Sequence, residues 1–346
     1  MGAKNLTFWL ARAAVGLAVS FQPGVKSDHF RRTGLKGQFV TNLNDFVAMQ
    51  THMSPMHASL GEKLVIGTAS WGNRYGMFND ISVNSFEAKN ILRTALLRGI
   101  TAIDTAPSYG DSELVLGSCD LAQFRVHTKV DLDTWSKGPE FAYEELLISF
   151  KRLGVESVEG LTFHSAESFL RDPQRAINFL LRIKSEGLAK TWGVSVYEPS
   201  QALEIIRLQS PDYIQAPASV LDRRFLEKSF ICQINEAKVR LQARSIFLQG
   251  LLLQDVDNLP IQFKEWEHFL LRYASIAKEL GISRFQLSLL PIVQEPAIDS
   301  VVIGINEKAH LLELMDALGS DAEIPPLNSI ESSNDLSLID PRRWKS

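Results

Sequence analysis

Cysteine is scarce in this sequence, with Cys119 and Cys232 the two among 346 residues. Two cysteines cannot form the disulfide framework of a small secreted domain, and neither has the paired Cys/His spacing of a structural zinc site. A membrane-spanning run is also missing, because the apolar stretch 8–21 is interrupted by Arg12 and is shorter than the roughly 20 residues that a bilayer requires. We therefore expect a cytoplasmic protein with no membrane partner.

An excess of positive charge is absent as well. The 36 basic and 40 acidic residues give a net charge of −4, which supplies no field for holding a nucleic-acid backbone. With 45% hydrophobic and 22% charged residues, the composition is that of an ordinary globular protein with a sizeable core. These values favour small-molecule chemistry and no nucleic-acid partner.

Three binding motifs are missing. No Gly-x-Gly-x-x-Gly follows a predicted strand, and no Gly-x-x-x-x-Gly-Lys-Ser/Thr occurs. The first absence weakens the interpretation as an open dinucleotide-binding sheet, and the second excludes a P-loop. No His-Glu-x-x-His or similar ligand spacing occurs on a predicted helix, so we expect no metal.

The charge distribution divides the chain. Residues 1–61 carry six basic and two acidic groups, or +4, so residues 62–346 carry 30 − 38 = −8. We expect residues 1–61 to be an N-terminal extension, either loose or the product of a mis-assigned start. A barrel is expected over 62–318 and a C-terminal tail over 319–346.

Regular alternation of strand and helix patterns begins near Lys63. Asn84 with Glu87 predicts a helix that ends near Gly99, and Asp172-Pro173 predicts another that ends near Gly187. Eight units favour a (β/α)₈ TIM barrel, with an open doubly wound sheet as the alternative. The predicted strands are Leu64–Ala69, Thr101–Thr105, Arg125–Val130, Gly160–Phe163, Thr191–Val194, Tyr213–Gln215, Ser245–Leu248 and Ser300–Ile303.

Four polar residues fall at or just after the ends of three successive predicted strands: Asp104, Tyr109, Lys129 and His164. In a barrel, strand ends converge on the face that carries the chemistry. A buried lysine balanced by an aspartate can lower the pKa of a neighbouring phenol, and a histidine can orient a carbonyl. Each residue alone has a plainer interpretation as a cap, a solvated end or a structural histidine, but all four together predict an active site with Tyr109 as proton donor.

At this constellation the sequence resembles the aldo/keto reductase family over about residues 62–318. The resemblance rests on Gly67–Gly72, Asp104–Tyr109 followed by Ser112–Gly117, Lys129, His164, Gly193–Tyr197, Ile214–Pro217, Leu221–Arg224, Gln249–Leu252 and Val302–Gly304. It implies a barrel that holds a nicotinamide cofactor without a glycine-rich fingerprint. It also implies that Asp104, Tyr109, Lys129 and His164 form the catalytic tetrad.

The resemblance extends to cofactor contacts. It implies that Ser195 and Gln215 hold the nicotinamide carboxamide and that the main chain of Gln249-Gly250-Leu251 runs along the pyrophosphate. After Gly304 the match is partial: Asn306, Lys308 and Glu313 are the candidate contacts, and Lys308 is the one obvious cation for a 2′-phosphate. NADPH is therefore the expected cofactor, with NADH as the alternative.

The resemblance also concerns two positions near the nicotinamide and the substrate. Ala218 stands where the resemblance implies a ring stacked on the nicotinamide, and Trp71 is the predicted wall of the substrate site.

The predicted activity is NAD(P)H-dependent reduction of an aldehyde or ketone, with a sugar-derived carbonyl among the candidates. The alternative is a catalytically weak or inactive nucleotide-binding barrel with a sensing or regulatory role. The sequence specifies neither the substrate nor the oligomeric state.

Overall fold

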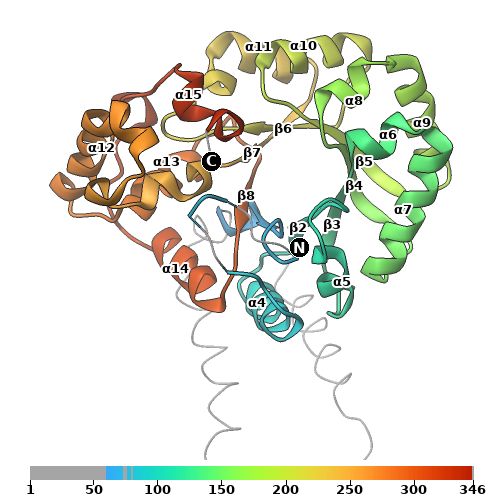
Figure 1. Ribbon diagram of the computed structural model, residues 1–346, viewed down its shortest axis with the longest axis horizontal. Coiled ribbons are helices and arrows are strands. Elements are labelled where there is room, and N and C mark those ends of the chain that lie inside the picture. The colour runs from blue at the N-terminus through green and yellow to red at the C-terminus, as the bar shows by residue number, and fades with distance from the viewer. Residues whose placement is uncertain (1–59, 73–75, 79–80, 345–346) are drawn as a thin grey trace, which may run out of the picture. The chain divides into compact units, whose positions relative to one another are not determined.

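The computed structural model describes residues 60–72, 76–78 and 81–344. Eight parallel strands form a closed barrel in chain order, β1 to β8, with β1 paired to β8 (Figure 1). The strands are β1 (Leu64–Gly67), β2 (Ala102–Asp104), β3 (Arg125–Val130), β4 (Val158–Phe163), β5 (Ala189–Ser195), β6 (Tyr213–Pro217), β7 (Arg240–Arg244) and β8 (Ser300–Gly304). The predicted (β/α)₈ barrel is confirmed.

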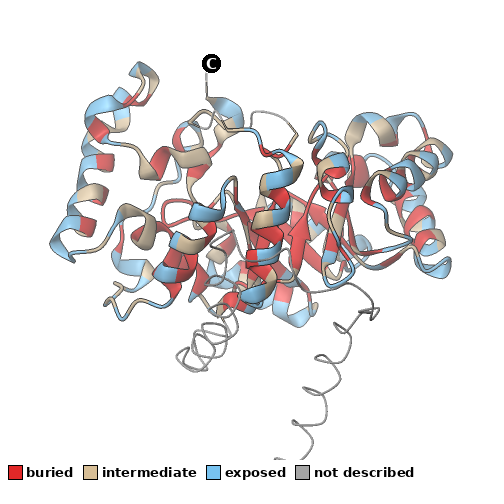
Figure 2. Ribbon diagram, turned by 90° about the horizontal axis from the view of Figure 1, so that it is seen from below, coloured by how far each residue is buried: buried red, intermediate tan, exposed pale blue. Residues whose placement is uncertain are grey.

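Helices cover the outside of the barrel. They are α4 (Ser85–Leu97), α5 (Ser112–Gly117), α6 (Leu132–Ser136), α7 (Pro139–Leu153), α8 (Ala166–Leu170), α9 (Pro173–Ser185), α10 (Pro199–Leu208), α11 (Lys228–Glu236), α12 (Glu267–Glu279), α13 (Arg284–Val293), α14 (Lys308–Leu318) and α15 (Leu336–Ile339). Figure 2 shows the strands buried at the centre, while the helices turn exposed faces to solvent. Within the described residues, no helix is both long and apolar enough to cross a membrane.

The two predicted helix starts are confirmed. Asn84 caps α4 by accepting hydrogen bonds from the backbone N–H groups of Phe86 and Glu87, and Asp172 caps α9 in the same way through Arg175. Such short polar side chains satisfy N–H groups that the first helical turn leaves unpaired. Gly99 and Gly187, just past the two helices, adopt the left-handed φ that glycine tolerates best.

The seventh strand was predicted in the wrong place. It spans Arg240–Arg244, whereas the predicted segment Ser245–Leu248 leads into a 3₁₀ helix (Leu248–Leu253). Ser245 and Leu248 both have positive φ, which ends the extended conformation. The true strand was overlooked because Gln242 and Arg244 are polar, although they alternate with buried Leu241 and Ala243.

The segment after α14 packs against the barrel. Ile330, Leu338 and Ile339 are buried, and the backbone N–H of Ser333 donates to the carbonyl of Leu221. Its last described residue, Trp344, lies edge-on to the ring of Phe263. The segment is thus folded onto the domain over residues 327–344. The expectation for residues 1–61 lies outside the described residues except for its last two positions.

Candidate active site

A buried ion pair joins the ends of β2 and β3. The Lys129 Nζ lies 2.5 Å from Asp104 Oδ2 and donates to the carbonyl of Thr105 at 2.9 Å, with side chains 0% and 5% exposed. A charge taken out of water is tolerated when an opposite charge and hydrogen bonds compensate it. The pair therefore fixes an ammonium group at the carboxyl end of the barrel.

Tyr109 lies beside this ammonium. The turn after β2 is closed by the Tyr109 N–H, which donates to the carbonyl of Ala106. The turn places the tyrosine ring 4.9 Å from Lys129 Nζ, and the ring of His164 stands edge-on to it at 5.7 Å. The structure thus brings together the four residues that the sequence predicts as a tetrad.

His164 has a partner that the sequence did not predict. Its Nδ1 hydrogen-bonds to Asp131, and Ser108 Oγ donates to the same Asp131 oxygen at 2.9 Å. Burial alone would raise the pKa of Asp131, but the bonds from His164 and Ser108 and the charge of Lys129 outweigh it and hold the pKa below its usual value. Asp131 is the N-cap residue of α6, yet its side chain makes no capping bond there.

The side-chain amides of Gln215 and Gln242 extend the hydrogen-bond network from the ion pair across the barrel. Gln215 Nε2 donates to Asp104 Oδ1 and to Gln242 Oε1, both at 2.8 Å. Ser195 lies opposite Gln215 in the β5–β6 register, and both are 2% exposed. The two residues predicted to hold a carboxamide are thus neighbours beside Asp104.

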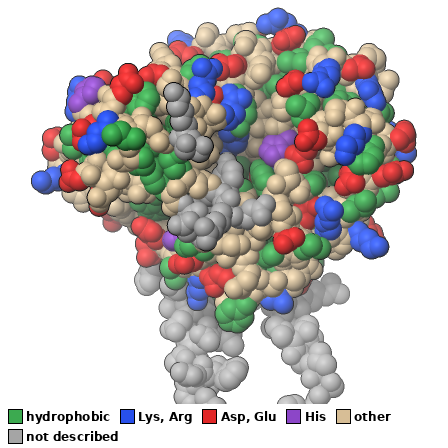
Figure 3. All heavy atoms as spheres, in the orientation of Figure 1, with side chains coloured by type: hydrophobic (Ala, Val, Ile, Leu, Met, Phe, Trp, Pro, Cys, Tyr) green, Lys and Arg blue, Asp and Glu red, His purple; other side chains and the backbone are tan. Residues whose placement is uncertain are grey.

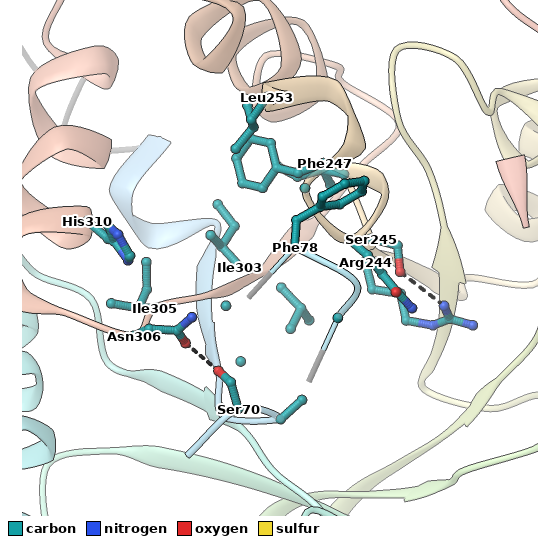
Figure 4. A pocket seen from close by; sticks show the side chains of 18 of the residues that line it. Ser70, Phe78, Arg244, Ser245, Phe247, Leu253, Ile303, Ile305, Asn306 and His310 are labelled. Carbon is teal, nitrogen blue, oxygen red and sulfur yellow. Dashed lines mark hydrogen bonds between the residues drawn. The ribbon is translucent and has the colours of Figure 1, made fainter. Parts of the chain in front are cut away.

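A cavity of about 600 Å³ opens over these strand ends. Figure 4 shows its polar Ser70–Asn306 pair on one side, with Arg244 and Ser245 on the other. The predicted site residues that line it are Asp104, Tyr109, Gln215, Gln249, Gly250, Gly304, Asn306 and Glu313. The predicted residues outside its lining are Trp71, Lys129, His164, Ser195, Leu251 and Lys308.

Two loops shape the cavity wall. Gln249 and Gly250 line the cavity and both have positive φ, so the chain after β7 makes a tight turn at the cavity wall. At Gly304 an added Cβ would meet no atom within 4 Å, which leaves the backbone at the end of β8 open to the cavity. Exposed main-chain groups at a strand end before a helix suit an anionic or nucleotide ligand.

Trp71 takes a structural position. It is 1% exposed, and its indole N–H donates to the carbonyl of Ile305 at 2.8 Å. That bond connects the loop after β1 to the loop after β8. Trp71 lies outside the cavity lining, and its role as a substrate wall stays a prediction. Ala218 is likewise buried, at 1% exposure.

Sequence reasoning missed three polar residues of this site: Asp131, Gln242 and Arg244. The location of Asp131 on this face was predictable, because a carboxylate directly after a predicted strand belongs to the same face as Lys129. Gln242 and Arg244 were hidden by the misplaced seventh strand. Among the residues that the structure describes, no group of three or more His, Cys, Asp or Glu side chains is placed to hold a metal ion.

Proteins similar in sequence include reductases and a channel subunit. The chain is 29% identical over 178 residues to an NADH-specific methylglyoxal reductase of Escherichia coli, a match that covers 44% of this chain and about half (54%) of that relative. It is 26% identical over 281 residues to the L-glyceraldehyde 3-phosphate reductase of E. coli, covering 69% of this chain and 81% of the relative. A probable voltage-gated potassium channel subunit beta of Arabidopsis thaliana is 24% identical over 304 residues, with coverages of 76% and 90%.

A solved structure supports the fold. A Pseudomonas aeruginosa protein described as an aldo-keto reductase superposes with a TM-score of 0.53 at 18% identity, covering 74% of this chain and 89% of that one. The sequence pattern of the aldo/keto reductase family matches residues 63–332, which is most of the chain. The match includes all eight strands and the residues of the site. The chain therefore belongs to the aldo/keto reductase family.

Proposed function

We propose that the protein is a nicotinamide-dependent oxidoreductase that reduces an aldehyde or ketone to an alcohol. The observation that carries the proposal is the buried ammonium of Lys129, held by Asp104 and lying 4.9 Å from the ring of Tyr109 at the edge of the cavity. Membership of a family that includes reductases of methylglyoxal and glyceraldehyde 3-phosphate supports the same reaction class.

The lining of the cavity fits a nicotinamide cofactor. The amide of Gln215 can pair with a carboxamide, and the open backbone at Gly304 together with the turn at Gly250 can contact phosphates. When bound, such a cofactor supplies the hydride that the carbonyl carbon receives. NADPH and NADH are both candidates. Glu313 is an acidic residue of the lining, whereas Lys308, the cation predicted to bind a 2′-phosphate, lies outside the lining.

The chain's own residues supply the proton. Tyr109 donates its phenolic proton to the carbonyl oxygen as that oxygen gains negative charge, and the phenolate left behind is stabilised by the Lys129 ammonium. His164, oriented by Asp131 through Nδ1, holds the carbonyl oxygen through its other ring nitrogen. Asp104 pairs with the lysine and holds it in place.

Titration of the full chain with NADH and NADPH, followed by a carbonyl panel, tests this proposal. The panel contains methylglyoxal, glyceraldehyde and glyceraldehyde 3-phosphate, each at saturating cofactor. We expect dinucleotide binding and turnover of at least one carbonyl, with no loss of activity on adding a chelator. Binding without turnover of any of the three would contradict the reductase proposal.

A second candidate function is supported by the channel-subunit relative. Its 24% identity extends over 304 residues, so the likeness covers most of this chain. In that case the barrel binds a nicotinamide nucleotide in order to sense or regulate, with weak or no turnover. The titration separates the two functions, because this candidate predicts tight binding of the dinucleotide and no carbonyl reduction above the rate of the Tyr109→Phe protein.

A further inference from the structure

Arg244 lies one layer above the polar centre of the barrel. On β7, alternate side chains share a face, so Arg244 lies on the same face as Gln242, one step closer to the carboxyl end. Gln242 reaches Asp104 through Gln215, by two hydrogen bonds of 2.8 Å. Arg244 therefore lies above Gln242 at the mouth of the barrel, and it lines the same cavity as Asp104 and Tyr109 (Figure 4).

The charge of Arg244 lacks a carboxylate partner among the described residues. Its guanidinium donates to the carbonyl of Val196 at 3.1 Å and to Ser245 Oγ at 3.3 Å. Arg284, the other arginine that lines the cavity, is paired with Asp255. The neighbouring arginines also have carboxylate partners: Arg224 has Asp222 and Glu198, and Arg342 has Asp340. Arg244 is thus a half-buried cation at the cavity wall with donors left over, since a guanidinium has five.

A stack of side chains fixes the guanidinium plane. Tyr197 lies between two arginines, with Arg244 4.3 Å from its ring centre and Arg342 3.2 Å. Arg342 is in turn held at 2.5 Å by the buried carboxylate of Asp340 in the C-terminal segment. In Figure 3, Lys or Arg side chains border the central hollow of this face on one side, and a histidine with acidic side chains beside it borders the other. A guanidinium fixed in this way loses little further freedom when it binds a planar anion.

We propose that Arg244 forms an anion subsite, which selects carbonyl substrates that carry a phosphate or carboxylate group. The proposal rests on the reductase function above. A fork of N–H donors pairs with such groups through two parallel, charge-assisted hydrogen bonds. The subsite would hold the charged end of the substrate while the carbonyl lies between Tyr109 and His164. The same chemistry could instead serve a phosphate of the dinucleotide, and the experiment separates these two sources.

Kinetics on a matched pair of substrates form the first arm. Glyceraldehyde and glyceraldehyde 3-phosphate differ by one phosphate group, and both are assayed with the full-length chain at saturating cofactor. For Arg244→Met we expect kcat/KM for the phosphorylated substrate to fall at least tenfold and for the neutral one less than threefold. Arg244→Lys should recover part of the loss, because it restores charge without the fork. The control Arg272→Met removes a surface arginine paired with Glu331 and should change neither value.

Binding measurements form the second arm. Calorimetry with glycerol 3-phosphate and with glycerol, both at saturating dinucleotide, measures the subsite without turnover. We expect glycerol 3-phosphate to bind more tightly than glycerol to the wild type, and this difference to vanish in Arg244→Met. If the variant instead weakens dinucleotide binding and leaves the ratio between the two substrates unchanged, the anion belongs to the dinucleotide and the proposal is wrong.

The two proposals fail in different ways. If no carbonyl is reduced but the Arg244-dependent binding of glycerol 3-phosphate persists, the anion subsite stands and the reductase function falls. If carbonyls are reduced with equal losses for the charged and the neutral substrate in Arg244→Met, the reductase function stands and the anion subsite is overturned. Circular dichroism of each variant shows whether its fold is retained.

Discussion

At the scale of single residues, the proposed function assigns proton donation to the hydroxyl of Tyr109. Replacing it by hydrogen in Tyr109→Phe keeps the ring that packs beside Lys129 and His164. We expect turnover to fall by roughly 10²–10⁴-fold, as for loss of a positioned general acid, while the dissociation constant of the dinucleotide changes less than about threefold. Steady-state kinetics and fluorescence titration measure the two quantities.

Two companion variants check the assignment. Lys129→Met should lower turnover at least as far as Tyr109→Phe, because it removes the charge that stabilises the phenolate. His164→Gln should be milder, since an amide can still hold the carbonyl oxygen. Full activity of Tyr109→Phe would place the proton donor elsewhere in the site.

The charge of Asp131 should appear in the kinetics. Because its pKa is held below the usual value, Asp131 is ionised throughout the neutral range, and its carboxylate is available to orient His164. Asp131→Asn keeps the shape and removes the charge, so we expect kcat/KM to fall about tenfold throughout the neutral range. Asp133→Asn on the exposed face of α6 is the control.

An unchanged kcat/KM in Asp131→Asn would contradict the electrostatic role of Asp131 and leave it a spacer. The facing charges are few: His164 and Lys129 act on it directly, and Glu113 lies close enough for a mutual repulsion. The contact of Asp131 and Ser108 with His164 could not be predicted from sequence, because it joins loops whose relative placement depends on the folded barrel.

At the scale of elements, glycines on two adjacent strands make room for one large ring. Gly160 on β4 and Gly193 on β5 both face Tyr213, and a Cβ added to Gly193 would lie 2.6 Å from Tyr213 Cδ2. Gly193→Ala should therefore lower the free energy of unfolding by about 1–3 kcal/mol through overpacking. Urea denaturation measures it. Gly319→Ala, whose Cβ would meet nothing closer than 3.5 Å, serves as the control and should be near neutral.

The elements also show where sequence reasoning succeeds. Helix starts at Asn84 and Asp172 were predictable because a cap is a local contact between residues two or three apart. Strand β7 was not, since its inward Gln242 and Arg244 belong to the polar mouth of the barrel and break the hydrophobic pattern. The strand-end rule still predicted that the four tetrad candidates lie together, because the closed barrel directs every carboxyl end to one face.

At the scale of the whole molecule, the free energy of unfolding should depend on the protonation of His127. Burial lowers its pKa to about 4, with Asp104 and Glu159 opposing and Lys129 and Arg125 reinforcing the shift. The unfolded chain takes up the proton near pH 6.5, before the folded one does, so stability falls as the pH drops from about 6.5 to about 4. The change from this residue should be about 3 kcal/mol.

Urea denaturation at pH 7 and pH 4 tests this linkage. In His127→Gln, which cannot take up a proton, the difference in unfolding free energy between the two pH values should shrink by about the same 3 kcal/mol. Tyr213 keeps its 2.7 Å contact with Thr162 in that variant, so the interior loses one 3.3 Å hydrogen bond and not the whole network. An unchanged difference would mean that His127 is not the group that titrates.

The pairing of β1 with β8 also sets the order in which the chain can fold. Leu64 pairs with Val301, so the two strands that close the ring are made near opposite ends of synthesis. Until β8 has left the ribosome, β1 and β7 each present an unpaired edge, which is a template for association with other chains. The nascent barrel is therefore exposed to misassembly while the chain from β2 to β7 is made. Closure by a single late strand removes both edges at once.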